Sequence, residues 1–231
     1  MTASTLYIAG DSHIECFKYA QKFGIQEKAI RILASHMAPG KTAQGLYRAQ
    51  NQTMYRKRIE ETVKEEYPDY IAIQLGEVDC GHTLWSRMLK NKTTKAIEID
   101  YAIGGIVLLA EIFNLYCNKQ IILLGPIIPL VAEYGEDTPK LLWPRKSVNA
   151  SQQERTNLTL KFNNKLKSVA KKHKYLYLDI NEQLLDPDTK VAKLEYQNKH
   201  SLHHIGAAKG AKLWMAALVK LLEERQLNVT A

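Results

Sequence analysis

A chain of 231 residues in which 45% are hydrophobic and 24% are charged has the composition of an ordinary globular protein, so a disordered, collagenous or coiled-coil chain is excluded. Its three cysteines are too few and too scattered for a disulfide framework, and no CxxC pair exists for a cysteine-built zinc knuckle. The formal net charge of +8 is spread in small basic groups, without the motif or concentrated stripe that nucleic-acid binding needs.

The sequence gives no indication of export or of a membrane span. The N-terminal residues lack the basic region of a secretory signal. The longest apolar stretch, 102–117, contains Glu111 and is too short to cross a bilayer. A chain of this length can bury roughly 70% of its unfolded surface in one core. We therefore expect one cytoplasmic domain over residues 1–231.

Short apolar runs alternate with longer segments of helical period along the whole chain. The apolar runs predict strands at 5–9, 29–34, 70–75, 120–124 and 175–180. The helical segments are 13–24, 53–66, 94–117, 150–172 and 207–225. Because most strand candidates are apolar throughout, both of their faces are expected to be buried, as in a parallel sheet. The alternation predicts a three-layer α/β/α sandwich with about five parallel strands.

The connection at 125–149 is unusually long and is rich in proline. Loops longer than about 12–15 residues are usually functional or disordered. This one leaves the carboxyl end of a predicted strand, where ligands bind in open α/β sheets. It is therefore expected to be either a substrate lid or a surface excursion packed on itself.

The first predicted strand runs directly into Gly10-Asp11-Ser12-His13. This turn places Ser12 at the carboxyl edge of the sheet and at the start of a helix, where free N–H groups favour a developing negative charge. A serine in that position can act as a nucleophile if a histidine base reaches it. The competing interpretation is a plain helix N-cap, for which Ser and Asp are both favoured.

Three further polar blocks follow other predicted strands. They are Gly40-Lys41-Thr42 after the second strand, Gly76-Glu77-Val78-Asp79 after the third, and His200-Ser201-Leu202-His203-His204 ahead of the last helix. Because the carboxyl ends of parallel strands share one edge, a parallel sheet would gather these blocks around Ser12.

With these blocks the sequence resembles the SGNH, or GDSL-like, hydrolase superfamily of esterases and acyl-transfer proteins, over essentially the whole chain. The resemblance implies a flavodoxin-like sheet. It also implies that Ser12 is the nucleophile and one oxyanion donor, that Gly40 gives a second oxyanion N–H, and that His203 is the base.

Two positions depart from the family pattern. Val78 stands where the family has an oxyanion asparagine, and His200 stands where it has an aspartate three residues before the base. Losing one oxyanion donor costs a factor of roughly 10²–10³ in rate. Other residues could take over these roles. Candidates to orient His203 are Asp186, Asp188 and Glu195, and candidates for the oxyanion are Gln74 and Lys41.

Several neighbours in the blocks are candidate supporting residues: Asp11, Gly76, Glu77, Asp79 and His200. Asp11 is expected to have a structural or pocket role. Glu77 and Asp79 would either hydrogen-bond a polar substrate or cap the adjoining segment.

The resemblance implies a serine hydrolase or acyltransferase that acts on an O-acyl ester, with a carbohydrate-linked acetyl group as the best substrate candidate. Neither a cofactor nor a nucleic-acid partner is expected. One alternative is a non-catalytic ligand-binding relative, in which Val78 and His200 mark lost chemistry. Another is a metal site built from the histidines at 200–204, although H-x-x-H-H lacks the i, i+4 spacing of the zinc helix motif.

Overall fold

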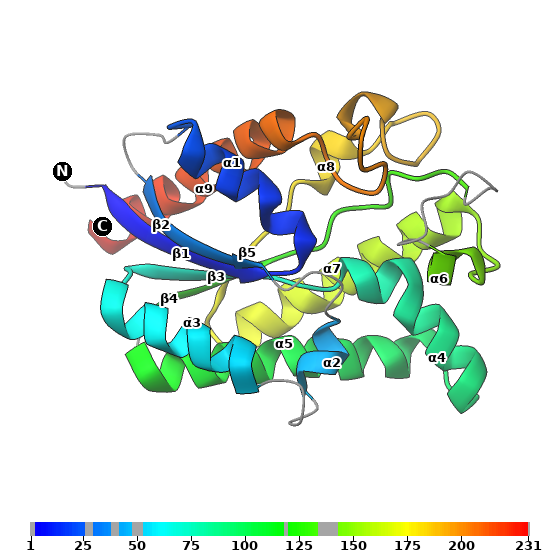
Figure 1. Ribbon diagram of the computed structural model, residues 1–231, viewed down its shortest axis with the longest axis horizontal. Coiled ribbons are helices and arrows are strands. Elements are labelled where there is room, and N and C mark those ends of the chain that lie inside the picture. The colour runs from blue at the N-terminus through cyan, green and yellow to red at the C-terminus, as the bar shows by residue number, and fades with distance from the viewer. Residues whose placement is uncertain are drawn as a thin grey trace.

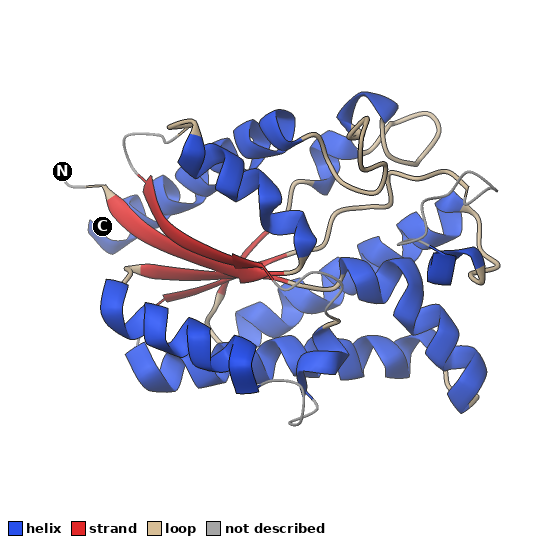
Figure 2. Ribbon diagram, in the orientation of Figure 1, coloured by secondary structure: helices blue, strands red, loops and turns tan. Residues whose placement is uncertain are grey.

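The computed structural model describes residues 3–25, 30–37, 42–47, 53–117, 120–133 and 143–230. A parallel sheet of five strands lies between two layers of helices (Figures 1 and 2), as the sequence predicts. The strands are β1 Ser4–Gly10, β2 Ile30–Met37, β3 Tyr70–Gln74, β4 Gln120–Leu124 and β5 Leu176–Leu178. Each of the five was predicted within a few residues of its bounds.

The strand order β2-β1-β3-β4-β5 is that of flavodoxin-like folds. The chain moves outward from β1 to β2 and then returns to place β3 on the other side of β1. The direction of winding therefore reverses between β1 and β3. Ligands of open α/β sheets bind outside the carboxyl ends of the strands at such a reversal.

Helices cover both faces of the sheet. Those predicted from the sequence are α1 Glu15–Lys22, α3 Thr53–Glu66, α5 Lys95–Cys117, α7 Gln152–Lys172 and α9 Ala207–Thr230. Those that were not predicted are α2 Ala43–Tyr47, α4 Leu84–Asn91, α6 Trp143–Lys146 and α8 Asn181–Leu184. The helices α2, α6 and α8 span too few turns to show a helical period, and α4 continues a π-helical turn at Asp79–Thr83.

Successive side chains of each central strand enter two separate cores, because side chains alternate across a strand. In β1, Tyr7 and Ala9 pack toward α3, α5 and α7, whereas Leu6 and Ile8 pack toward α1 and α9. The apolar stripe Leu158, Phe162 and Leu166 of α7 lies fully within the first of these cores. Burial on both faces explains why the strands are apolar throughout.

The described part of the long connection is largely packed against the protein. Ile127, Ile128 and Leu130 are buried in the core beside α1 and α9. Arg155 of α7, itself buried, donates to the carbonyl oxygens of Val131 at 2.9 Å and Ala132 at 2.5 Å. Residues 134–142 lie outside the described residues, so the lid interpretation stays a prediction.

Within the described ranges, no helix is both long and apolar enough to cross a membrane.

Candidate functional site

The turn after β1 is shaped by close contact with β3. A Cβ atom on Gly10 would collide with the Gln74 carbonyl oxygen and with the Ile14 side chain, so only glycine fits. The Asp11 N–H donates to the same Gln74 carbonyl at 3.2 Å. The Asp11 carboxylate then accepts the His13 N–H at 2.9 Å, which caps the short 3-10 turn Ser12–Ile14. The turn leaves Ser12 partly exposed at the carboxyl end of the sheet.

A histidine from the far end of the chain reaches this serine. His204 Nε2 lies 2.9 Å from Ser12 Oγ, and His204 Nδ1 lies 2.7 Å from Ser201 Oγ. When the Ser12 hydroxyl donates to Nε2, Nδ1 carries the proton and donates to the Ser201 oxygen. This is the tautomer that a general base needs, and the structure forms a Ser12–His204–Ser201 chain of hydrogen bonds.

The histidine beside Ser12 is not the one that the sequence led us to expect. The expected partner was His203, whereas the imidazole within hydrogen-bond distance of Ser12 Oγ is that of His204. The turn that carries both histidines is closed by the His204 N–H donating to the Ser201 carbonyl at 2.8 Å, and it places the His204 imidazole rather than that of His203 against Ser12. His203 is buried, its Nδ1 lies 3.5 Å from Ser201 Oγ, and its carbonyl oxygen faces His13.

The contact also changes which residue stands three positions before the histidine that reaches Ser12. The residue three positions before His204 is Ser201, not His200. His200 is exposed, and only its backbone N–H is fixed, by the Asn198 side chain at 2.9 Å. The sequence holds two adjacent histidines, with His200 three positions before His203 and Ser201 three positions before His204. Spacing alone therefore does not decide which histidine reaches Ser12.

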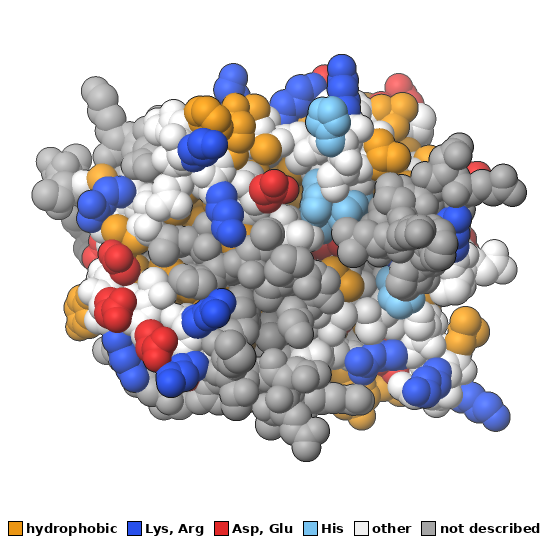
Figure 3. All heavy atoms as spheres, viewed as in Figure 1, with side chains coloured by type: hydrophobic (Ala, Val, Ile, Leu, Met, Phe, Trp, Pro, Cys, Tyr) orange, Lys and Arg blue, Asp and Glu red, His pale blue; other side chains and the backbone are white. Residues whose placement is uncertain are grey.

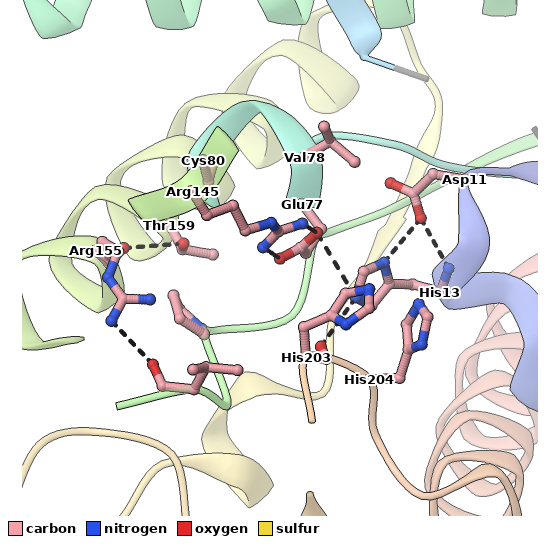
Figure 4. Close-up of polar contacts among 12 residues, drawn as sticks. Asp11, His13, Glu77, Val78, Cys80, Arg145, Arg155, Thr159, His203 and His204 are labelled. Carbon is pink, nitrogen blue, oxygen red and sulfur yellow. Dashed lines mark hydrogen bonds and ion pairs between the residues drawn. The ribbon is translucent and has the colours of Figure 1, made fainter. Parts of the chain in front are cut away.

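The two residues that flank Ser12 in the sequence, Asp11 and His13, belong to a buried group of charges (Figure 4). His13 Nδ1 is 3.0 Å from Asp11 Oδ1, and its Nε2 is 3.7 Å from Glu77 Oε2. Glu77 forms a two-pronged ion pair with Arg145 of α6, with both hydrogen bonds at 2.6 Å. Planar, paired contacts of this kind are the strongest that a carboxylate makes with a side chain. Glu77 thus joins the end of β3 to the far side of the long connection.

The pKa values follow from these charges. Burial alone would raise the pKa of Glu77, but the Arg145 guanidinium and His13 hold it well below its usual range. Burial alone would lower the pKa of His13, but the carboxylates of Glu77 and Asp11 outweigh burial and raise it. Burial, with the neighbouring positive charge of His13, lowers the pKa of His204 to about 3. His204 is therefore neutral, and able to accept a proton, at neutral pH.

The other predicted residues of the third block have structural contacts. Gly76 has a backbone φ of +115°, and a Cβ there would come within 2.9 Å of the Phe162 ring. Asp79 is fully buried, and its Oδ2 accepts the Ala43 N–H at 2.7 Å, so it holds the start of α2. Burial raises the pKa of Asp79 to about 7. The Val78 side chain is partly buried.

Of Gly40, Lys41 and Gln74, which are candidates to stabilise the oxyanion, the structure describes Gln74. Gly40 and Lys41 lie outside the described residues. Gln74 is buried at the end of β3, in register with Gly10, and neither polar atom of its side chain has a hydrogen-bond partner among the described residues.

Histidine side chains reach the surface near this end of the sheet (Figure 3). Among the described residues, no group of three or more His, Cys, Asp or Glu side chains is placed to hold a metal ion.

No protein-family model matches the chain, and no curated protein matches its sequence. Solved structures match its fold. A GDSL-like lipase from Bacteroides thetaiotaomicron aligns with 96% of this chain and 89% of its own, at 16% identity and a TM-score of 0.63. An acetylxylan esterase from Geobacillus stearothermophilus, crystallised as a catalytic mutant, aligns with 96% of this chain and 95% of its own, at 17% identity and a TM-score of 0.54. The chain therefore has an SGNH-like α/β fold, and its structural neighbours include ester hydrolases.

Proposed function

We propose that the protein is a serine hydrolase or acyltransferase that acts on O-acyl esters with Ser12 as nucleophile and His204 as base. The observation that carries this proposal is the 2.9 Å contact between Ser12 Oγ and His204 Nε2 at the carboxyl end of the sheet. A nucleophile within hydrogen-bond reach of a base, with a third group orienting that base, is the arrangement of covalent acyl-transfer enzymes.

The steps follow from the tautomer. His204 Nε2 removes the Ser12 proton as Oγ attacks the ester carbonyl, and the Nδ1–H stays bonded to Ser201. The imidazolium then gives its proton to the leaving alkoxide, and an acyl-serine remains. Water or an acceptor hydroxyl attacks the acyl group, again with His204 as base, and Ser12 is regenerated.

The negative charge on the tetrahedral intermediate needs hydrogen-bond donors. The Ser12 N–H at the start of its turn and the Gly40 N–H are the backbone donors that the resemblance implies. We add the Gln74 amide in place of the missing asparagine, because it is buried without a partner and pairs in register with Gly10, two residues before Ser12.

The proposed substrate is a small ester, with an acetyl group on a carbohydrate as the first to test. The motif resemblance and the likeness to the acetylxylan esterase support this substrate.

A second candidate is a ligand-binding relative without activity. Two observations favour it: the residue that orients His204 is a neutral serine rather than a carboxylate, and the pKa of His204 is lowered to about 3. A base of such low pKa is a weak proton acceptor.

Labelling with a fluorophosphonate separates the two candidates. The proposal expects an adduct on Ser12 that is lost in Ser12→Ala and falls at least a hundredfold in rate in His204→Ala. His203→Ala is the matched control, because it removes the adjacent imidazole, and it should keep the rate within about tenfold. No adduct on folded wild-type protein, under conditions that label a known serine hydrolase, would favour the binding protein. Equal loss in both histidine variants would contradict the choice of base.

A further inference from the structure

The imidazole of His13 is buried between the His203 carbonyl oxygen and the Asp11 carboxylate. Both groups accept hydrogen bonds from the ring. Its Nε2 lies 3.2 Å from the His203 carbonyl oxygen, which has no proton to give. Its Nδ1 lies 3.0 Å from Asp11 Oδ1, which also accepts the His13 backbone N–H at 2.9 Å. Nε2 must therefore carry a proton.

The proton between Nδ1 and Asp11 belongs on the nitrogen, because imidazole is a stronger base than a carboxylate. Both ring nitrogens are then protonated and the ring carries a positive charge. The surroundings balance that charge: Asp11 and Glu77 are the two carboxylates, and Arg145 is the second cation. Two negative and two positive groups make a buried set with no net charge, which lowers the cost of burying each one.

This charged ring lies directly against the proposed base. The centroids of the His13 and His204 rings are 4.6 Å apart in an edge-to-face arrangement, and the His203 ring lies 3.9 Å from that of His204. The charged and titratable groups near enough to act on the charge of His204 are His13, His203, Glu77 and Arg145. His13 is the cation among them in ring contact with His204.

We propose that His13 is a fixed imidazolium that acts as a positioning residue, because its positive charge lies in ring contact with His204 and opposes the protonation of that base. That role in catalysis rests on the proposed function, whereas the charge on His13 does not. An unprotonated His204 keeps accepting the Ser12 hydroxyl at a pH where an ordinary histidine would be protonated and would release it. The proposed hydrolase would then work in acid, with a weaker base as the consequence.

The test is ¹⁵N NMR of the histidine rings in the whole protein between pH 3.5 and 8, which needs no substrate. The expected result for wild-type protein is that both His13 nitrogens are protonated at pH 7 and that His204 titrates below pH 5. His13→Gln keeps a neutral donor in place of the ring and should raise the titration midpoint of His204 by about one unit. His173→Gln, at the partly exposed end of α7, is the matched control and should leave the midpoint unchanged.

The outcomes separate this proposal from the proposed function. If one nitrogen of the His13 ring is unprotonated at pH 7, the proposed charge on His13 is wrong. This measurement needs only the wild-type protein, so it decides the matter even if no variant folds. If His13 is charged but its replacement by Gln or Asn leaves the titration midpoint of His204 unchanged, then His13 does not act on the base. If the ring titrations agree and no ester is cleaved, the charge assignment stands and only the hydrolase fails. If esters are cleaved, the acid limb of the pH profile of kcat/KM should move to higher pH in His13→Gln, by the same amount as the titration midpoint of His204.

Discussion

At the scale of single residues, the site depends on which of two adjacent histidines faces Ser12. Polar spacing in the sequence indicates that a histidine near the last helix reaches the serine, but His203 and His204 both satisfy it. The turn at 201–204 decides between them. It places His204 Nε2 beside Ser12 Oγ and the His203 carbonyl oxygen beside His13 Nε2. The turn is held by backbone hydrogen bonds and by the Asn198 side chain, which accepts the N–H groups of His200 and Ser201, so residue spacing alone does not predict which histidine faces Ser12.

Ser201 is a neutral partner for the base and can be replaced by a charged one. In Ser201→Asp the carboxylate would accept the His204 Nδ1–H and stabilise the imidazolium that forms as Ser12 attacks. The loss of such a carboxylate costs about 10⁴ in a serine protease, so we expect a gain in kcat/KM of roughly 10- to 100-fold here. Ser201→Ala removes the acceptor and should lower kcat/KM about tenfold. Unchanged kcat/KM in both Ser201→Asp and Ser201→Ala would mean that Ser201 does not orient the base.

A substitution at Gln74 should affect activity and leave stability unchanged. The buried Gln74 amide has no partner among the described residues, so replacing it with Met, of similar shape, should leave the free energy of unfolding unchanged or raise it. If the amide serves the oxyanion, kcat should fall by roughly 10²–10³. The two quantities are measured by ester hydrolysis and urea unfolding, with Gln183→Met at an exposed position as control. Unchanged kcat in Gln74→Met would remove Gln74 from the proposed oxyanion site.

At the scale of secondary structure, Arg155 ties together both sides of the long connection. Besides the Val131 and Ala132 carbonyls, it donates from Nε to the Ala150 carbonyl at 3.4 Å. These residues stand on either side of 134–142. The buried guanidinium on α7 thus brings the two ends of the excursion to one point, as loop closure requires.

Arg155→Met should therefore loosen the connection and leave the sheet intact. Losing hydrogen bonds from a buried charged donor leaves carbonyl groups unpaired, at a cost of about 3 kcal/mol in the free energy of unfolding. Amide hydrogen exchange at 127–132 should speed up more than exchange in β1. Lys161→Met, at an exposed position on the same helix, should stay within about 0.5 kcal/mol of wild type. Uniform acceleration across β1 and the connection would argue against a local role.

Long periodic elements could be predicted, and short ones that depend on contacts could not. The strand β4 and the helix α3 were predicted at their observed bounds, because buried strands are apolar throughout and long helices repeat their apolar face. The helices α4 and α6 were missed. The first continues a π-helical turn at Asp79–Thr83, and the second carries Arg145, which is fixed by an ion pair with a residue far away in sequence. The Glu77–Arg145 pair could not be found from the sequence for the same reason.

At the scale of the whole molecule, stability should depend on pH through Asp79. Its folded pKa of about 7 lies above the unfolded value of 3.8, so the folded state holds a proton that the unfolded state has lost. Stability from this group is present in full below about pH 4 and is lost as pH rises through 7. One pKa unit corresponds to 1.36 kcal/mol, which gives a loss of about 2–3 kcal/mol between pH 5 and 8.

Asp79→Asn keeps an oxygen for the Ala43 N–H and removes the titration. The difference in unfolding free energy between pH 5 and 8 should shrink by about 2 kcal/mol relative to wild type. The control is Asp100→Asn, where the carboxylate is exposed beside Lys165 and should change the difference little. Urea unfolding at both pH values gives the comparison. A pH difference in Asp79→Asn equal to that of wild type would assign the dependence to another group.

The contact between Ser12 and His204 joins residues 192 positions apart. On a ribosome that adds 5–20 residues per second, the histidine is made about 10–40 seconds after the serine. Throughout that interval Ser12 has neither His204 nor the last helix beside it. Under the proposed function, newly made chains carry an unactivated hydroxyl, and reactivity toward esters would begin only when α9 has packed against the finished sheet. Time-resolved labelling of nascent chains would date the moment at which this protein acquires its chemistry.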